Sequence, residues 1–142
     1  MLLCDFLFPF NPLQKGLPLP DFFYPSRDTE KPLKGLADNL FHNLENFSNQ
    51  DYPEYEIIFS LRDNNNPTYK IARKTKNQNP QRNISFLVER CNEGLIEKVN
   101  NLIPACKIVK HQLMLGSDSN AMVAGNYLKE NTRPMKGSGA VL

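Results

Sequence analysis

From residue 36 onward, short apolar runs alternate with segments in which apolar residues recur at helical spacing. Leu36, Leu40, Leu44 and Phe47 lie three or four residues apart with polar residues between them, which predicts an amphipathic helix. The run Tyr55–Leu61 is apolar, contains isoleucine and phenylalanine, and is only seven residues long. Such a run is typical of a strand that is buried on both faces.

The rest of the chain continues this alternation. An asparagine-rich loop at residues 63–67 precedes a helical segment at 68–76. The remaining elements that we predict are a strand at 84–88, a helix at 97–103 that ends before Pro104, a strand at 112–116 and a short helix at 126–131. Strands that alternate with helices in this way form βαβ units, so we expect an α/β fold with a mostly parallel sheet and flanking helices.

Residues 1–30 have a different composition and no periodicity. Six of the 11 prolines lie within the first 32 residues. We therefore divide the chain into an irregular proline-rich head, residues 1–30, and a folded domain, residues 31–142. The segment Pro25–Glu30 is too polar for a buried strand on this reading. The apolar segment Met1–Phe10 is too short to cross a bilayer and lacks the features of a signal peptide. It is either a loosely packed terminus, which we prefer, or a contact with a membrane or a partner.

Composition and charge exclude several classes of protein. The net charge is +2, which favours no polyanionic partner. The three cysteines have no Cys-x-x-Cys spacing, which argues against a disulfide framework or a zinc site and fits a reducing compartment. The basic segment Lys70–Lys76 could contact nucleic acid, but it has little aromatic interleaving. A solvated helix face explains it better, so we expect no nucleic-acid partner.

Two aspartates follow predicted strands directly. Asp63 follows the strand at residues 55–61, and Asp118 follows the strand at 112–116. Ligands of open α/β sheets bind beyond the carboxyl ends of the strands, so we expect both carboxylates at one edge of the sheet, within ~10–12 Å of each other, a span suited to one bound ligand. The alternative for each is a turn residue, because aspartate favours turns. Lys98, at the start of a predicted helix, could meet a phosphate or be simply solvated.

Taken in order along the chain, several short segments resemble ceramide glucosyltransferases, which are inverting glycosyltransferases. These segments are Lys31-Pro32-Leu33-Lys34-Gly35, Asn43-Leu44-Glu45, residues 51–56, the strand that ends at Asp63, Gly94 with residues 98–102, and Ser117-Asp118-Ser119. The resemblance covers roughly residues 31 to 130. Each segment is weak alone, but the ordered set at these spacings is specific.

The resemblance implies a GT-A fold, a Rossmann-like fold that binds nucleotide sugars. It implies transfer of glucose from UDP-glucose to ceramide, with Mg²⁺ or Mn²⁺ at the diphosphate, on the cytosolic face of the Golgi membrane. In this family, Asp63 corresponds to the aspartate that contacts the UDP part. Asp118 corresponds to the aspartate that binds the metal and diphosphate, and Lys98 to the lysine of the loop before the Asn100-Asn101-Leu102 segment. Asn120 replaces a second acid after Asp118.

The chain also departs from the family pattern. We expect the family's first strand to be replaced by residues 25–30, and we find no counterpart to the aspartate that acts as general base. The Gln-x-x-Arg-Trp motif and the membrane anchors of the family have no counterpart either. We therefore interpret residues 31–142 as the N-terminal half of a catalytic domain. We expect this half to be inactive by itself. The alternative function is a catalytically inactive nucleotide-binding or protein-interaction module.

Overall fold

The structure is a computed structural model that describes residues 7–9, 26–33, 38–92, 94–111, 113–118 and 120–132. The strands are β1 (Leu7–Pro9), β2 (Arg27–Pro32), β3 (Tyr55–Leu61), β4 (Asn83–Val88) and β5 (Leu113–Gly116). The helices are α1 (Leu40–Ser48), α2 (Pro67–Gln78), α3 (Glu97–Ile108) and α4 (Tyr127–Thr132). Within the described ranges, no helix is long and apolar enough to span a bilayer.

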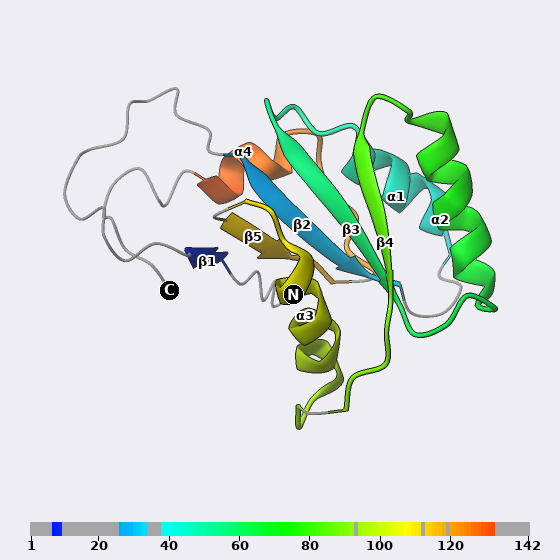
Figure 1. The fold of residues 1–142 in the computed structure, drawn as a ribbon. Helices are drawn as coiled ribbons and strands as arrows, with labels where there is room; N and C mark the ends of the chain where they lie inside the picture. The colour runs from blue at the N-terminus through cyan, green and yellow to red at the C-terminus, as the bar shows by residue number, and fades with distance from the viewer. Residues whose placement is uncertain are drawn as a thin grey trace.

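The strands form a single sheet in the order β1-β5-β2-β3-β4 (Figure 1). Strand β2 pairs in parallel with β3 on one side and with β5 on the other, and β4 pairs in parallel with β3. Strand β1 is antiparallel to β5. The prediction of a mostly parallel sheet with flanking helices is confirmed.

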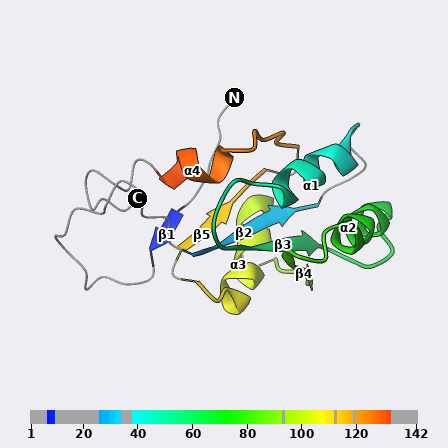
Figure 2. The same cartoon turned by 90° about the horizontal axis from the view of Figure 1, so that it is seen from above.

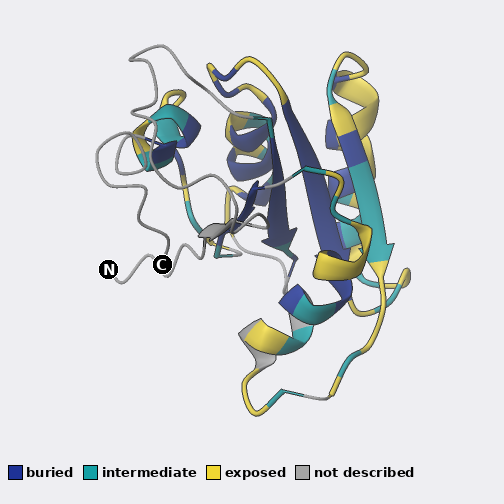
Figure 3. Ribbon diagram, turned by 60° about the vertical axis from the view of Figure 1, so that its left-hand side comes forward, coloured by how far each residue is buried: buried dark blue, intermediate teal, exposed yellow. Residues whose placement is uncertain are grey.

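Helices cover both faces of the sheet. Helices α1 and α4 lie on one face and α3 on the other (Figure 2). The main core cluster packs α1, α2 and α4 against the sheet through residues such as Leu44, Ala72, Phe59 and Leu128. Strands β2 and β3 are buried along nearly their whole length, whereas β4 is only partly covered (Figure 3).

The start of α2 follows from its local sequence. The side chain of Asn66 accepts a hydrogen bond from the Thr68 backbone N–H at 3.1 Å, and Pro67 occupies the first helical position. Both residues are favourable there, because the amide oxygen caps a free N–H and proline has no N–H to leave unpaired. The predicted strand at 112–116 is found as β5, although Gln112 lies outside the described residues.

The prediction that Pro104 ends the third helix was wrong. Helix α3 continues through Pro104 to Ile108. Proline in a helix interior removes one main-chain hydrogen bond and strains the preceding turn. Here Leu102 and Ala105, on either side of the proline, both pack against Met114 of β5. Burial of apolar side chains on both sides of Pro104 therefore offsets the defect that proline introduces.

The prediction that residues 25–30 cannot form a buried strand was also wrong. Strand β2 is central, and Arg27, Asp28, Thr29 and Glu30 are at most 1% exposed. A central strand is held by main-chain hydrogen bonds to both of its neighbours, which do not depend on apolar side chains. The charge of Arg27, the first residue of β2, is partly compensated. Its guanidinium lies 4.6 Å from the Tyr52 ring centre and donates a hydrogen bond to the Thr132 hydroxyl.

The N-terminal segment also contains an element that the sequence pattern did not indicate. Leu7–Pro9 forms β1, which extends the sheet beside β5 with Leu7 opposite Leu115. The prediction of a loosely packed terminus over Met1–Phe10 was therefore wrong for Leu7–Pro9. Residues 1–6 and 10–25 lie outside the described part of the chain.

Candidate functional site

The parallel pairing brings the ends of β2, β3 and β5 to one edge of the sheet, which we call the carboxyl edge. Ser60 of β3 lies opposite Pro32 of β2, and Glu30 of β2 lies opposite Gly116 of β5. Asp63 and Asp118 follow these strand ends, so both lie at the carboxyl edge, as their positions predict. One strand, β2, lies between β3 and β5, so these two strands are roughly 10 Å apart.

The Asp63 side chain is held by its own turn. Its Oδ1 accepts a hydrogen bond from the Asn65 backbone N–H at 3.0 Å, and its Oδ2 lies 3.7 Å from Nη2 of Arg90. The first contact is an Asx-turn, so the turn interpretation of Asp63 is correct. The turn does not exclude a binding role, because the carboxylate remains 44% exposed and its direction is fixed.

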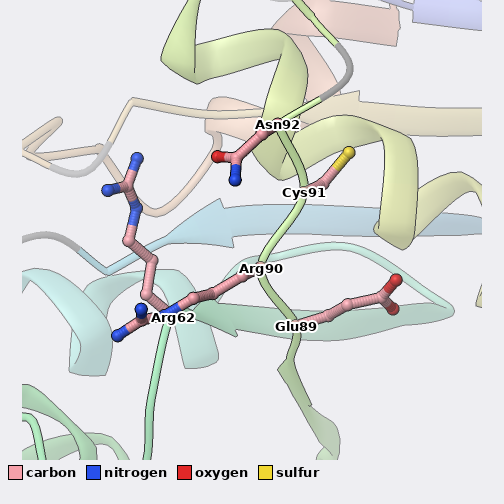
Figure 4. A pocket seen from close by; sticks show the side chains of 5 residues that line it. All are labelled: Arg62, Glu89, Arg90, Cys91 and Asn92. Carbon is pink, nitrogen blue, oxygen red and sulfur yellow. The ribbon is translucent and has the colours of Figure 1, made fainter.

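A polar pocket of about 200 Å³ lies beside Asp63 at the ends of β3 and β4. Figure 4 shows the five side chains that line it: Arg62, Glu89, Arg90, Cys91 and Asn92. Arg90 is also the partner of Asp63, so the pocket and this aspartate form one continuous surface. The sequence analysis did not identify these residues, although Arg62 and Glu89 directly follow strands and share the positional signal of Asp63.

The loop that carries Asp118 is anchored by a buried lysine. Nζ of Lys31 donates to the backbone carbonyl oxygens of Asp118 at 2.9 Å and of Ala121 at 3.3 Å. The same ammonium lies 4.6 Å from the centre of the Phe47 ring, and Lys31 is 0% exposed. A cation between an aromatic face and carbonyl oxygens is well compensated. Sequence reasoning quoted Lys31 within a motif but missed this role.

The segment before α3 is closed by a side-chain clamp. Oδ1 of Asn100 accepts from the Gly94 backbone N–H at 2.6 Å, and Nδ2 of Asn100 donates to the Gly94 carbonyl oxygen at 3.2 Å. A Cβ at position 94 would lie 2.8 Å from Cγ1 of Val99, so only glycine fits there. Lys98 lies in the first turn of α3. The clamp holds this turn to Gly94, in the segment that connects β4 to α3.

The basic segment Lys70–Lys76, which we considered as a possible nucleic-acid contact, lies on the outer surface of α2. Lys70, Arg73, Lys74 and Lys76 are exposed. Two of them cover aromatic rings, since Nζ of Lys74 lies 4.6 Å from the Phe41 ring centre and Nζ of Lys76 lies 5.4 Å from that of Phe86. These lysines therefore have a role in covering apolar surface.

Comparisons with known proteins agree with this architecture. The sequence pattern of glycosyl transferase family 21 matches residues 20–142. Ceramide glucosyltransferase 1 of Caenorhabditis elegans is 31% identical over 100 residues, which are 70% of this chain and 22% of that protein. Ceramide glucosyltransferase of Komagataella phaffii is 28% identical over 105 residues, which are 71% of this chain and 21% of that protein. The chain thus spans about a fifth of the length of these relatives.

A solved structure shows the same fold. A mannosyltransferase from Pyrobaculum calidifontis, determined in complex with GDP-Man and Mn²⁺, superposes with a TM-score of 0.62 at 19% identity. The match covers 71% of this chain and 29% of the mannosyltransferase, so the fold is part of a Rossmann-like glycosyltransferase fold. Because the family pattern extends over nearly all of the domain that contains the carboxyl edge, the chain belongs to glycosyl transferase family 21.

Proposed function

We propose that this chain provides the nucleotide-sugar-binding part of a ceramide glucosyltransferase, which transfers glucose from UDP-glucose to the primary hydroxyl of ceramide. The observation that carries the proposal is the pair of aspartates at one edge of the sheet, with a polar pocket beside Asp63 and a lysine anchor beneath Asp118. The named relatives support the choice of sugar donor and lipid acceptor.

In this proposal each residue has a separate role. Asp63 accepts hydrogen bonds from the uridine, whose rings occupy the pocket at the ends of β3 and β4. Lys98, in the first turn of α3, neutralises phosphate charge near a helix N-terminus. Asp118 holds the divalent cation at the diphosphate. Glucose transfer would occur on the cytosolic face of the Golgi membrane, as in the family that the sequence resembles.

The residues present fit a divalent cation of the Mg²⁺ or Mn²⁺ type. Mg²⁺ is usually held by one or two carboxylates, with substrate phosphates and water as its other ligands. Asp118 supplies one such carboxylate, and exposed Asn120 supplies an amide oxygen nearby in the chain. The backbone carbonyl of Asp118 accepts a hydrogen bond from Lys31, which fixes the loop that carries the proposed metal ligand. When bound, the cation would stabilise the charge of the UDP leaving group.

The experiment that tests this function is a calorimetric titration of the purified chain with UDP in the presence of Mn²⁺. We expect saturable binding that EDTA abolishes. Asp118→Asn and Asp63→Asn should each weaken binding by about tenfold or more, because each removes a charge-assisted contact of over ~1.4 kcal/mol. The matched control is Asp51→Asn, which removes an exposed aspartate before β3, at the opposite edge. Unchanged binding in the Asp63 and Asp118 variants would contradict the proposal.

A catalytically inactive nucleotide-binding module is the second candidate. It rests on the same site, because the carboxyl edge and the polar pocket support nucleotide binding whether or not glucose is transferred. The two candidates agree on UDP binding and differ only in whether glucose is transferred. Because residues 1–142 alone are expected to be inactive in either case, the genomic sequence separates the two: a reading frame that continues past Leu142 to an aspartate and a Gln-x-x-Arg-Trp motif would favour the enzyme.

A further inference from the structure

The opposite edge of the sheet, where the parallel strands begin, carries a second group of titratable side chains. Asp28 of β2, Glu56 of β3 and His111, just before β5, each place a potential metal-ligating atom within 4.8 Å of the others. Asp28 is 0% exposed, the Glu56 side chain 3% and the His111 side chain 21%. They face the same side of the sheet as α3, because Asp28 and Glu56 are paired neighbours and alternate with residues of the main core.

Each carboxylate has one oxygen engaged by the protein and one left over. Oδ2 of Asp28 accepts hydrogen bonds from the backbone N–H groups of Lys110 at 2.9 Å and His111 at 2.6 Å. Oε1 of Glu56 accepts from the Ser85 hydroxyl at 2.8 Å and from Nζ of Lys110 at 3.1 Å. These contacts fix the direction of both carboxylates.

The remaining atoms of the cluster are buried and lack hydrogen bonds. Oδ1 of Asp28, Oε2 of Glu56 and Nδ1 of His111 all have no hydrogen-bond partner. Oδ1 of Asp28 and Nδ1 of His111 lie 3.3 Å apart without forming a hydrogen bond. Leaving a buried polar atom without a hydrogen bond is costly, most of all for a carboxylate oxygen, and here two carboxylate oxygens and one imidazole nitrogen converge.

The neighbouring charges do not balance the cluster. Two carboxylates are buried there, and among the described residues their ion-pair partners are Lys110, which contacts Glu56, and His111, which is cationic only when protonated and contacts Asp28. The Lys110 side chain is 64% exposed, so most of its charge is solvated and it can turn away into water. A cation that reaches the buried atoms would remove the deficit.

We propose that Asp28, Glu56 and His111 bind a divalent transition-metal ion, with Zn²⁺ as the best fit. Two carboxylate oxygens and one imidazole nitrogen are a ligand set that zinc accepts, and it leaves a position for water. The imidazole nitrogen favours zinc over Mg²⁺ or Ca²⁺, which prefer oxygen ligands only. Ligand atoms on one tetrahedral zinc ion lie roughly 3.4 Å apart, so the side chains need to close by about 1–1.5 Å.

The effect that we expect from this ion is stabilisation of the fold. It would join the starts of β2, β3 and β5, which are three strands drawn from distant parts of the sequence. The site is independent of the proposed diphosphate site, because Asp63 and Asp118 lie at the other end of the same strands. Metal binding here neither requires a nucleotide nor depends on the proposed function.

The test is a titration of the metal-free chain with Zn²⁺ in the absence of nucleotide, followed by calorimetry. Co²⁺ serves as a spectroscopic substitute for zinc, with visible absorption that reports an ordered site. We expect one equivalent to bind and the melting temperature to rise by ~5 °C or more at saturating Zn²⁺. His111→Gln should weaken binding by about 100-fold or more, since loss of an outer contact alone typically costs 10–100-fold.

Matched variants keep this result interpretable. His42→Gln removes the other histidine, which is exposed on α1, and should leave binding unchanged. Lys110→Gln should strengthen binding, because it removes a competing charge from Glu56. Asp118→Asn should retain the site, which separates it from the proposed diphosphate metal. Because Asp28→Asn could impair folding, the assignment depends on the surface-accessible His111 and Lys110 variants.

Three outcomes would overturn the proposal. The first is no binding of Zn²⁺ or Co²⁺ below ~1 mM, where affinity is too weak for a built site. The second is equal affinity in wild type and His111→Gln, which would place the ion elsewhere. The third is loss of binding in His42→Gln or Asp118→Asn. Failure of UDP binding, by contrast, would affect only the proposed function.

Discussion

The positions of residues at the carboxyl edge are set in part by buried side chains that do not themselves contact a ligand. Lys31 is the main example, because its ammonium holds the carbonyl oxygens of Asp118 and Ala121 from inside the core. The lysine and Asp118 are separated by 87 residues. The position of the Asp118 loop is therefore a property of the folded chain rather than of the loop sequence.

We predict that Lys31→Met weakens metal-dependent UDP binding by about tenfold or more while the chain stays folded. Methionine fills a similar volume, and replacing a buried charge by an apolar group is often neutral for stability. The loop, however, loses the cation that positions its carbonyls. Calorimetric UDP binding and a thermal melt measure the two effects separately.

The control for this variant is Lys74→Met on α2. Lys74 also covers an aromatic ring at 4.6 Å, but it is exposed and distant in sequence from the Asp118 loop. Its substitution should not change UDP binding. If Lys31→Met bound UDP as tightly as Lys74→Met, the proposed positioning role of Lys31 would be wrong.

At the scale of elements, β1, β2 and α3 are the ones that local sequence misjudges. Strand β2 carries Arg27, Asp28, Glu30 and Lys31 into the centre of the sheet. Burial lowers the pKa of the Arg27 guanidinium, although electrostatic attraction and a hydrogen bond to Tyr52 partly counteract this. Helix α3 lies over the side of β2 that carries Asp28 and Glu30. The negative charges of these side chains therefore act on titratable groups of the helix.

The pKa of Cys106 in α3 shows this electrostatic effect of β2 on the helix. Burial raises the pKa of the Cys106 thiol, and the negative charge of Glu30 raises it further. The thiolate is the reactive form, so we predict that Cys106 is alkylated by iodoacetamide at pH 8 roughly twofold or more slowly than in the urea-unfolded chain. Its rate should rise with pH at a higher midpoint than that of an ordinary thiol.

Glu30→Gln should lower this midpoint, because it removes the second cause of the raised pKa. The measurement uses a chain with serine at positions 4 and 91, so that Cys106 is the sole thiol, and mass spectrometry to follow its modification. Glu89→Gln is the matched control, since Glu89 pairs with Lys107 of the same helix. An identical midpoint in wild type and Glu30→Gln would show that the strand charge does not reach the helix.

At the scale of the whole molecule, one sheet supports two separate polar edges. The carboxyl edge carries Asp63, Asp118 and the polar pocket, and the opposite edge carries the buried cluster around Asp28. In open α/β sheets ligands bind at the carboxyl edge. This general rule supports the proposed nucleotide-sugar site there and a purely structural ion at the other end.

We predict that residues 1–142 alone do not transfer glucose to ceramide at a measurable rate. They contain no tryptophan and hence no Gln-x-x-Arg-Trp motif, and the resemblance to ceramide glucosyltransferases implies that the general base is not among them. A general base typically contributes ~10²–10⁴-fold to rate, and positioning of the substrate contributes more. The assay combines the purified chain, labelled UDP-glucose, Mn²⁺ and ceramide in detergent, with Asp118→Ala as the background. Glucosylceramide above that background would refute the prediction.

Much of the fold and part of the candidate site follow from local pattern. Strand β3 is recognisable because a strand buried on both faces needs a continuous apolar run, and α1 because its buried face recurs every three or four residues. The location of Asp63 and Asp118 at strand ends is likewise readable, because aspartate terminates strands and opens turns. In a parallel sheet, strand ends share one edge, so sequence position alone predicts that these two residues lie at the same edge.

Strand order and the buried polar contacts depended on the folded chain. Strand β2 was missed because its place is decided by main-chain pairing with β3 and β5 on either side, and its own side chains are polar. The anchor between Lys31 and the Asp118 loop and the cluster of Asp28, Glu56 and His111 join residues far apart in sequence. Local periodicity reports only which face of an element is buried. Which buried groups meet across the core is set by how the elements pack, and that arrangement exists only in the tertiary structure.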